Sequence, residues 1–212
     1  RSVLRADFQS AGRGLLDRTW EARRGANLLV SLLFRTIPAH LHVLTQAVAL
    51  SGVIAARELC GVQAQLKWPN DILVGHDKLS GILAQAAPVD EAGHVPFVVV
   101  GIGCNLSWAP PGAASLASCG WTRAVTPDEF LAAMLPEIDR LLLLDEVAMH
   151  EEYLANLATV GTQVRAEMPN GEHIIGRALT VESDGRLVIL DDCAISHRID
   201  TADVVHLRPA SD

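Results

Sequence analysis

The stretch Lys67-Trp68-Pro69-Asn70-Asp71 places an ammonium, an amide and a carboxylate within five residues. The run 63–66 leads into it, and a strand-like run, 72–74, follows at once. Pro69 lacks a backbone N–H and has a fixed φ, so a central strand cannot continue through it. The pattern predicts a sharp, charged corner between two strands. An ordinary hairpin with a solvated lysine and an Asx turn is the alternative.

A glycine–arginine loop, Gln9-Ser10-Ala11-Gly12-Arg13-Gly14, follows an expected strand at 3–8. Glycines let backbone N–H groups approach a ligand closely, and successive N–H groups can form a nest for an anion. Arg13 and Arg18 add forked donors suited to carboxylate or phosphate. The loop has neither the Walker pattern nor G-x-G-x-x-G spacing. Trp20 is either a core anchor or a stacking platform for a flat ring.

The charge is unevenly distributed along the chain. The net charge is −8, which argues against general nucleic-acid binding. Residues 1–24 hold six arginines against three acids, a local charge of +3, so the remainder carries −11. A basic, glycine-rich patch in an acidic protein suits a small anion better than a polymer. A chance arginine cluster on a solvated edge is the alternative.

Composition also bears on the class and location of the protein. Half of the 212 residues are hydrophobic, enough for a full core, and no apolar run reaches bilayer length, so we expect no membrane span. The dispersed cysteines, without a C-x-x-C pair, indicate a reducing compartment and argue against zinc: Cys60, Cys104, Cys119 and Cys193. We expect a cytoplasmic protein. Residues 1–5 read like the middle of a domain, so an N-terminal segment is expected to be missing.

The first part of the chain reads as strands and long helices. Strands are expected at 26–35, 78–84 and 95–104, a buried helix at 40–60 ended by Gly61, and a helical region at 126–158, with a kink or break at Pro136 or 141–144. Gly81 and the Gly-Ile-Gly of 101–103 remove side chains where a ligand or another backbone needs room.

The composition changes near Gly161. Short strands at 173–182, 186–190, 194–199 and 204–208 are separated by Asn-Gly and Asp-Gly turns, which predicts a small β-barrel or sandwich with a docking or covering role. We divide the chain into residues 1–158 and 161–212. The predicted fold class is α+β, with a mixed sheet packed by helices on one side.

Four motifs in this order resemble those of the biotin protein ligase family, and the C-terminal module resembles that family's small SH3-like domain. The resemblance spans nearly the whole chain. The motifs are Gln9-Ser-Ala-Gly-Arg-Gly with Trp20, Lys67-Trp-Pro-Asn-Asp, Lys78-Leu-Ser-Gly-Ile-Leu and Gly101-Ile-Gly-Cys-Asn-Leu. The resemblance implies that biotin and MgATP form biotinyl-5′-AMP. Biotin then passes from this adenylate to a lysine of the biotin carboxyl carrier protein of an acyl-CoA carboxylase. No tightly bound metal is implied.

The resemblance also implies roles for individual residues. Lys67 would hold the biotin carboxylate and the α-phosphate, and Arg18 would contact phosphate. Arg13, with Gly12 and Gly14, would form a loop closing over biotin. The head group of biotin would bind Gln9 and the backbone near Gly81. The nucleotide would lie beside Trp20 and Asn105, with Mg²⁺ near Asn70.

Two departures from the family keep alternatives open. The family loop commonly reads Gly-Arg-Gly-Arg, but Leu15 follows Gly14 here. The usual segment that lines the biotin pocket before this loop is also not seen. A lipoate or octanoyl ligase shares the fold, although Lys67–Asp71 with a C-terminal barrel favours biotin. A non-catalytic paralogue that binds biotin or a carrier protein is a second alternative. A biotin-sensing repressor would need a DNA-binding domain that is not visible.

Overall fold

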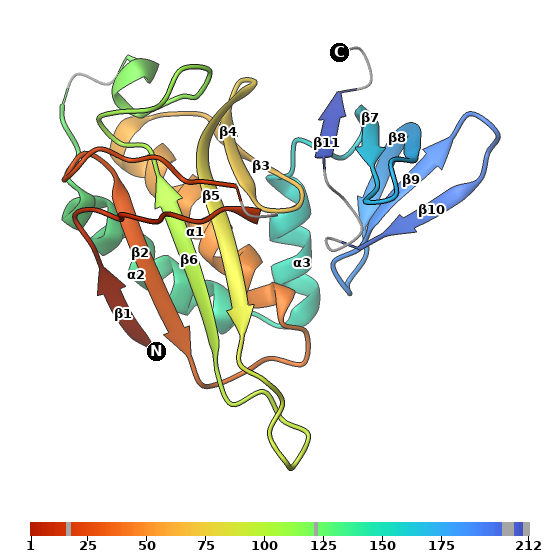
Figure 1. Cartoon of the computed structure of the whole chain (residues 1–212), viewed down its shortest axis with the longest axis horizontal. Helices are drawn as coiled ribbons and strands as arrows, with labels where there is room; N and C mark the ends of the chain where they lie inside the picture. Colours follow the sequence, from red (N-terminus) through yellow and green to blue (C-terminus); the bar gives the residue numbers. More distant parts are fainter. Residues whose placement is uncertain (16–17, 121–122, 201–205, 210–212) are drawn as a thin grey trace.

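A six-stranded antiparallel sheet forms the centre of the larger part of the molecule (Figure 1). The computed structural model describes residues 1–15, 18–120, 123–200 and 206–209. The strand order is β1-β2-β6-β5-β4-β3. The strands are β1 (Ser2–Arg5), β2 (Leu28–Phe34), β3 (Ala64–Lys67), β4 (Asp71–Val74), β5 (Asp77–Ala86) and β6 (Val98–Cys104).

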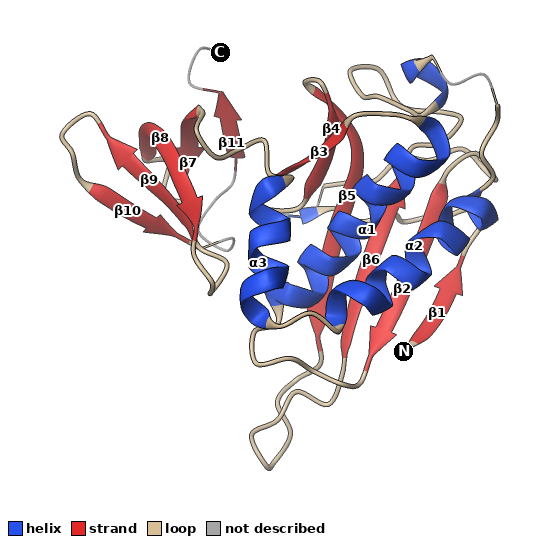
Figure 2. Cartoon of the chain, turned by 180° about the vertical axis from the view of Figure 1, so that it is seen from behind, coloured by secondary structure: helices blue, strands red, loops and turns tan. Residues whose placement is uncertain are grey.

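Helices cover one face of this sheet (Figure 2). α1 (His42–Cys60) is apolar almost all round and packs against the sheet and α2. It ends where Gly61 adopts a left-handed φ of 62° and its N–H bonds to the carbonyls of Ala56 and Arg57, as the sequence predicts. By length and hydropathy α1 could span a bilayer, contrary to our expectation of no such run, but 67% of its 18-residue apolar window is buried inside the protein. It is therefore the core helix.

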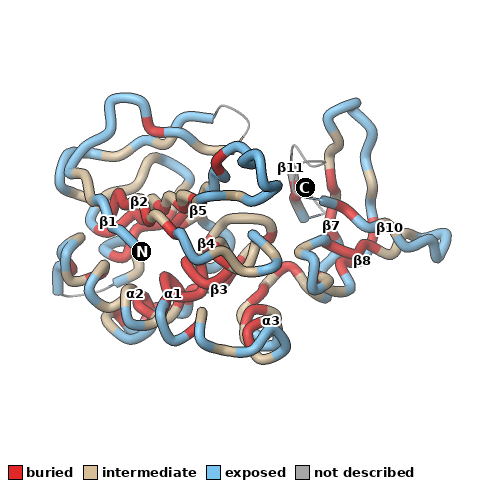
Figure 3. Tube along the Cα trace, turned by 90° about the horizontal axis from the view of Figure 1, so that it is seen from below, coloured by how far each residue is buried: buried red, intermediate tan, exposed pale blue. Residues whose placement is uncertain are grey.

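The predicted helical region after residue 126 is two helices, α2 (Pro127–Leu142) and α3 (Glu146–Ala155). Thr126 and Glu129 form a reciprocal capping box at the start of α2. The helix continues through Pro136, and the break falls at residues 143–145, where Asp145 caps α3. Figure 3 shows the buried residues gathered where these helices meet the sheet.

The C-terminal part is a separate five-stranded antiparallel sheet in the order β10-β9-β8-β7-β11. Its strands are β7 (Gln163–Glu167), β8 (His173–Val181), β9 (Leu187–Asp191), β10 (Ser196–Ile199) and β11 (His206–Pro209). Part of the strand predicted at 204–208 lies outside the described residues.

The predicted α+β class is confirmed, with corrections in detail. The larger sheet is antiparallel among the described residues and not mixed, because its neighbouring strands are joined by hairpins or by returning connections. The first strand ends at Arg5 and not at residue 8. The described residues of the segment 6–27 instead cross over β2, β6 and β5 on the face opposite the helices (Figures 1 and 2). This crossing segment carries the predicted anion loop.

Candidate functional site

Three sequence motifs meet in one row across the larger sheet. Lys67 pairs with Asp71, Asp71 with Gly81, and Gly81 with Gly103. Residues directly opposite each other on antiparallel strands share a face of the sheet. The corner 67–71, the glycine inside β5 and the glycine inside β6 therefore lie side by side, although 36 positions separate the ends of the row in sequence.

A cavity of about 800 Å³ opens above this row. Its size and its mixed polar and apolar lining are typical of a small-molecule site. Nine of the ten residues proposed from the sequence line it: Gln9, Arg13, Gly14, Arg18, Trp20, Lys67, Asn70, Gly81 and Asn105. Gly12 does not line it, because its backbone lies beneath the carbonyl of Trp20, where a Cβ atom would come within 2.4 Å of that oxygen.

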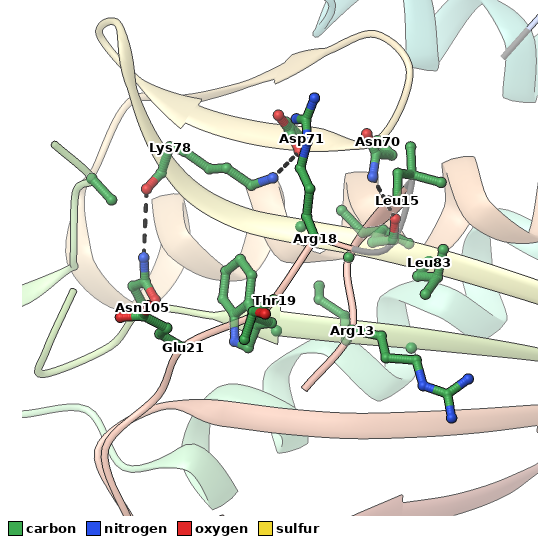
Figure 4. Close-up of a pocket in the computed structure, with 18 of the residues that line it drawn as sticks. Arg13, Leu15, Arg18, Thr19, Glu21, Asn70, Asp71, Lys78, Leu83 and Asn105 are labelled. Atoms are coloured by element: carbon green, nitrogen blue, oxygen red, sulfur yellow. Dashed lines mark hydrogen bonds and ion pairs between the residues drawn. The ribbon is translucent and has the colours of Figure 1, made fainter. Parts of the chain in front are cut away.

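The glycine–arginine loop closes on itself over the cavity. Gly14 N–H donates to the carbonyl of Arg18 at 2.6 Å, and Trp20 N–H donates to the carbonyl of Gly12 at 3.0 Å. An isolated antiparallel bridge joins Arg13 and Thr19 between these bonds. In Figure 4 the side chains of Arg13 and Arg18 leave the loop in different directions. Both side chains therefore come from one short loop but point toward different parts of the cavity.

The Trp20 ring lies against the two glycines of the row. A Cβ atom on Gly103 would come within 2.5 Å of the ring, and one on Gly81 within 3.3 Å. Any side chain at Gly103 would displace the ring, so this glycine serves close approach. The buried Trp20 Nε1 has no hydrogen-bond partner among the described residues, which leaves its N–H as a donor for a ligand or a water.

Asp71 and Lys78 are site residues that our sequence predictions did not assign. Lys78 Nζ lies 2.5 Å from Asp71 Oδ1 (Figure 4). The same Nζ lies 5.8 Å from the centre of the Trp20 ring. The pair is an electrostatic contact and not a well-aligned hydrogen bond, since Asp71 Oδ1 has no hydrogen-bond partner among the described residues. Lys78 also folds back over Gly81, where a Cβ atom would come within 3.2 Å of Nζ. A movable cation thus lies over the centre of the row.

Lys67 and Lys78 are the only lysines in this chain of 212 residues, and both line the cavity. All other fixed cations in the sequence are arginines. An ammonium is a compact, freely rotating donor, whereas a guanidinium is a planar fork. Both lysines of the chain therefore lie in the lining of this one cavity. The scarcity of lysine can be read from the sequence, and it would have identified Lys78 as a second candidate beside Lys67.

The two asparagines of the site are also tied to the protein. Asn70 Nδ2 donates to the carbonyl of Ile82 at 2.8 Å, and Ile82 N–H donates back to the carbonyl of Asn70 at 2.9 Å. Asn105 is buried; its Nδ2 donates to the carbonyl of Ala114 at 3.0 Å, and its Oδ1 accepts from Asn27 at 3.2 Å. Asn70 Oδ1 is the atom available to a ligand, whereas Asn105 chiefly fixes the segments beside the cavity.

The comparisons with known proteins agree with this geometry. Residues 2–105 match the model of the biotin/lipoate A/B protein ligase family. A biotin–[acetyl-CoA-carboxylase] ligase of Mycobacterium tuberculosis is 33% identical over 97% of this chain and 79% of its own length. The chain belongs to the biotin protein ligase family.

Further relatives extend the likeness. The structure of the biotin protein ligase from Aquifex aeolicus in complex with biotin and ATP superposes with a TM-score of 0.81 at 25% identity, over 98% of this chain and 89% of that one. The bifunctional ligase/repressor BirA of Bacillus subtilis is 29% identical over 89% of this chain, which spans 61% of that protein's length.

Within this family fold, the buried cysteine beside the site is not an activated thiol. Burial raises the pKa of the Cys104 thiol, which lies at the end of β6, far above its usual range. A thiol held neutral is a poor nucleophile. Among the residues that the structure describes, no group of three or more histidine, cysteine or acidic side chains is arranged to hold a metal ion.

Leu15 lines the cavity at the position where the family loop commonly carries an arginine. It is half-buried, and Figure 4 places it near Asn70 and Leu83. The departure identified in the sequence is thus a change in the lining of the cavity itself and not a change on a remote surface.

Proposed function

We propose that this protein attaches biotin to a lysine of a biotin carboxyl carrier domain in two steps. First, an oxygen of the biotin carboxylate attacks the α-phosphorus of ATP, the bond to the bridging oxygen breaks, and pyrophosphate leaves. Second, the amine of the acceptor lysine attacks the acyl carbon and loses a proton, and AMP leaves with the bonding electrons. The observation that carries this proposal is the gathering of both lysines of the chain at one cavity above the row Lys67–Asp71–Gly81–Gly103.

The cations of the site answer the main difficulty of the first step, which is to bring a carboxylate against a triphosphate. Fixed positive groups offset this repulsion and hold the reacting atoms together. We assign Lys67 to the biotin carboxylate and the α-phosphate, and Arg18 to phosphate. Lys78, over the centre of the row, is a second candidate for the same contact. Arg13 and the glycines beside it would close over the bound intermediate.

The residues at the corner fit a magnesium ion bound together with a nucleotide. Mg²⁺ is commonly held by one or two carboxylates and by substrate phosphates. Asp71 offers a buried carboxylate oxygen without a hydrogen-bond donor among the described residues, and the neighbouring Asn70 offers its Oδ1. Bound there, the ion would neutralise phosphate charge. Release of Lys78 from Asp71 would then direct its ammonium toward the substrates.

The remaining assignments concern binding and partners. Gln9 and the backbone near Gly81 would bind the head group of biotin, and Trp20 would pack beside adenine. The carrier would be that of an acyl-CoA carboxylase, since the ligase of Mycobacterium tuberculosis is named for acetyl-CoA carboxylase. We place the reaction in the cytoplasm, and we divide the protein into a catalytic domain, 1–158, and a C-terminal domain, 161–212.

Biotin-dependent exchange of labelled pyrophosphate into ATP tests the proposal directly. Exchange with biotin, but not with lipoate or octanoate, is expected. Exchange with lipoate alone would establish the lipoate-ligase alternative. Absence of exchange while calorimetry still detects biotin binding would establish a non-catalytic paralogue and refute the proposed activity.

A further inference from the structure

The side chain of Trp68 joins the two sheets of the molecule. It is 2% exposed, and its Nε1 donates to the carbonyl of Gly185 at 3.0 Å. Gly185 lies in the turn between β8 and β9, 117 positions further along the chain. Trp68 itself stands between Lys67 and the rest of the corner that lines the cavity. A residue inside the catalytic motif is therefore held by the C-terminal sheet.

The backbone of the same residue is held from a second direction. Trp68 N–H donates to Thr159 Oγ1 at 2.9 Å, and Thr159 is only 5% exposed. Just before it, Leu66 N–H donates to the carbonyl of Asn156 and Ala158 N–H donates to the carbonyl of Leu66, both at 2.8 Å. The connection between α3 and the C-terminal sheet thus runs along the outer edge of β3 as a short added strand.

The turn that accepts the Trp68 bond is fixed on its other side by α1. A Cβ atom on Gly185 would come within 2.9 Å of the His42 ring, at the start of that helix. Gly185 also has a φ of +90°, which an L side chain rarely adopts. Since the turn is confined between His42 and Trp68, its carbonyl is a rigid acceptor for the indole N–H.

We propose that Thr159 and Trp68 are positioning residues through which the C-terminal sheet sets the geometry of the Lys67–Asp71 corner. This inference rests on the proposed ligase activity. The two hydrogen bonds fix both the backbone and the side chain of the residue next to Lys67. Small displacements of groups that hold reacting atoms lower the rate of the chemical step strongly. The C-terminal sheet therefore contributes to adenylation through the placement of Trp68, besides the apolar side chain of Leu207 in β11, which lines the cavity.

The test compares near-isosteric variants of the full chain. Thr159→Val removes the acceptor of Trp68 N–H, and Trp68→Phe removes the donor to Gly185 while keeping an apolar ring. Thr159→Ser keeps the hydroxyl and is the rescue variant. Thr180→Val is the matched control, because the Thr180 hydroxyl contacts only the carbonyl of its neighbour Val181 within β8. The measurements are kcat and KM in biotin-dependent pyrophosphate exchange, with folded sites counted by the stoichiometry of biotin binding.

We expect kcat per folded site to fall about tenfold in Thr159→Val and in Trp68→Phe, with KM for biotin within about twofold of wild type. Thr159→Ser and Thr180→Val should stay within about twofold of wild type in both parameters. The proposal is overturned if either test variant keeps more than half of the wild-type kcat, if only KM changes, or if Thr159→Ser or Thr180→Val loses as much as Thr159→Val. A wild-type protein without exchange would instead refute the ligase activity.

Discussion

The corner 67–71 and the loop 9–20 face each other across one cavity but are held in different ways. The corner is paired with β5 through Asp71 and Gly81, tied to Ile82 by two bonds of Asn70, and fixed by Trp68 to the C-terminal sheet. Its charged groups are therefore in place before any ligand arrives, which is the arrangement that favours electrostatic catalysis.

The loop depends on far fewer contacts. Its described residues are joined mainly by backbone bonds between the two ends of the loop itself, and Gln9, Ser10, Ala11 and Arg13 are exposed. Trp20 is its main apolar anchor, resting on Gly103. Segments with few buried contacts open at low free-energy cost. We infer from this difference that, in the proposed reaction, the corner would hold the charges that act and the loop would retain the activated biotin.

The largest expected effect on the reaction rate is that of replacing Lys67, the lysine of the corner. Lys67→Ala should lower the rate of biotin-dependent pyrophosphate exchange by about 10²–10³-fold, because it removes a cation near the developing charge. Lys67→Arg is the charge-retaining control and Lys78→Ala the comparison. A near-normal rate in Lys67→Ala together with a large loss in Lys78→Ala would move the assigned contact to Lys78. Near-normal rates in both would contradict any role for the lysines in the chemical step.

The second prediction concerns the order of the loop, residues 10–18, of which residues 16 and 17 lie outside the described part of the chain. Biotinyl-5′-AMP should slow amide hydrogen exchange in this loop by at least about tenfold, because the ligand supplies the contacts that the free loop lacks. The amides of β4 should change far less. Equal protection of the loop with and without the ligand, measured by mass spectrometry, would mean that loop and corner do not differ in the way proposed.

The corner could largely be predicted from the sequence, whereas the pairing of charges within the site could not. Pro69 removes a backbone donor and forces the chain to turn, so the corner follows from local chemistry. The glycines Gly81 and Gly103 within apolar runs likewise indicated a place where another group packs close to the backbone, which is the Trp20 ring. The meeting of Asp71 with Lys78 depends on a register shift between β4 and β5 at Ile72 and Leu73, which no local pattern reveals.

Other parts of the site also depended on tertiary structure. Asn105 lines the cavity, and its place near the nucleotide stays a prediction; its buried bond with Asn27, 78 positions away, was not foreseen. The link from Trp68 to Gly185 joins two parts that appear independent in sequence. The alternation of apolar and polar residues and the turn residues predicted the C-terminal strands. The turn at Gly185, however, carries no sequence pattern that identifies Trp68 as its contact.

A smaller effect is expected at Leu15, on the loop side. An arginine there would add one charged hydrogen bond to the adenylate, worth about 1.5–3 kcal/mol if fully formed. Because Arg13 and Arg18 remain, we expect the intermediate to form in the natural sequence but to be held less tightly. Leu15→Arg should slow the dissociation of biotinyl-5′-AMP several-fold, measured by rapid dilution, and should reduce the labelling of added non-carrier proteins. Leu15→Met, which adds no charge, is the control. Equal dissociation rates would mean that Arg18 already supplies the contact.

The smallest effect concerns pH and the support of the corner. Burial lowers the pKa of His42 below its ordinary 6.5, aided by His40 and His150, while the Ser183 backbone and Asp184 oppose the shift. The unfolded chain therefore binds a proton at His42 more readily than the folded protein does. The contribution of His42 to the free energy of unfolding is complete above pH 6.5 and is lost as the pH falls toward the folded pKa.

Replacement of His42 by glutamine, which cannot be protonated, should consequently weaken the fall in Tm between pH 7 and pH 5. The effect should be modest, because the site is only partly buried and solvent screens the charge. His94→Gln, at an exposed position in the loop between β5 and β6, is the control and should leave the slope unchanged. If His42→Gln and wild type lose Tm in parallel, protonation of His42 does not oppose the docking of the β8–β9 turn.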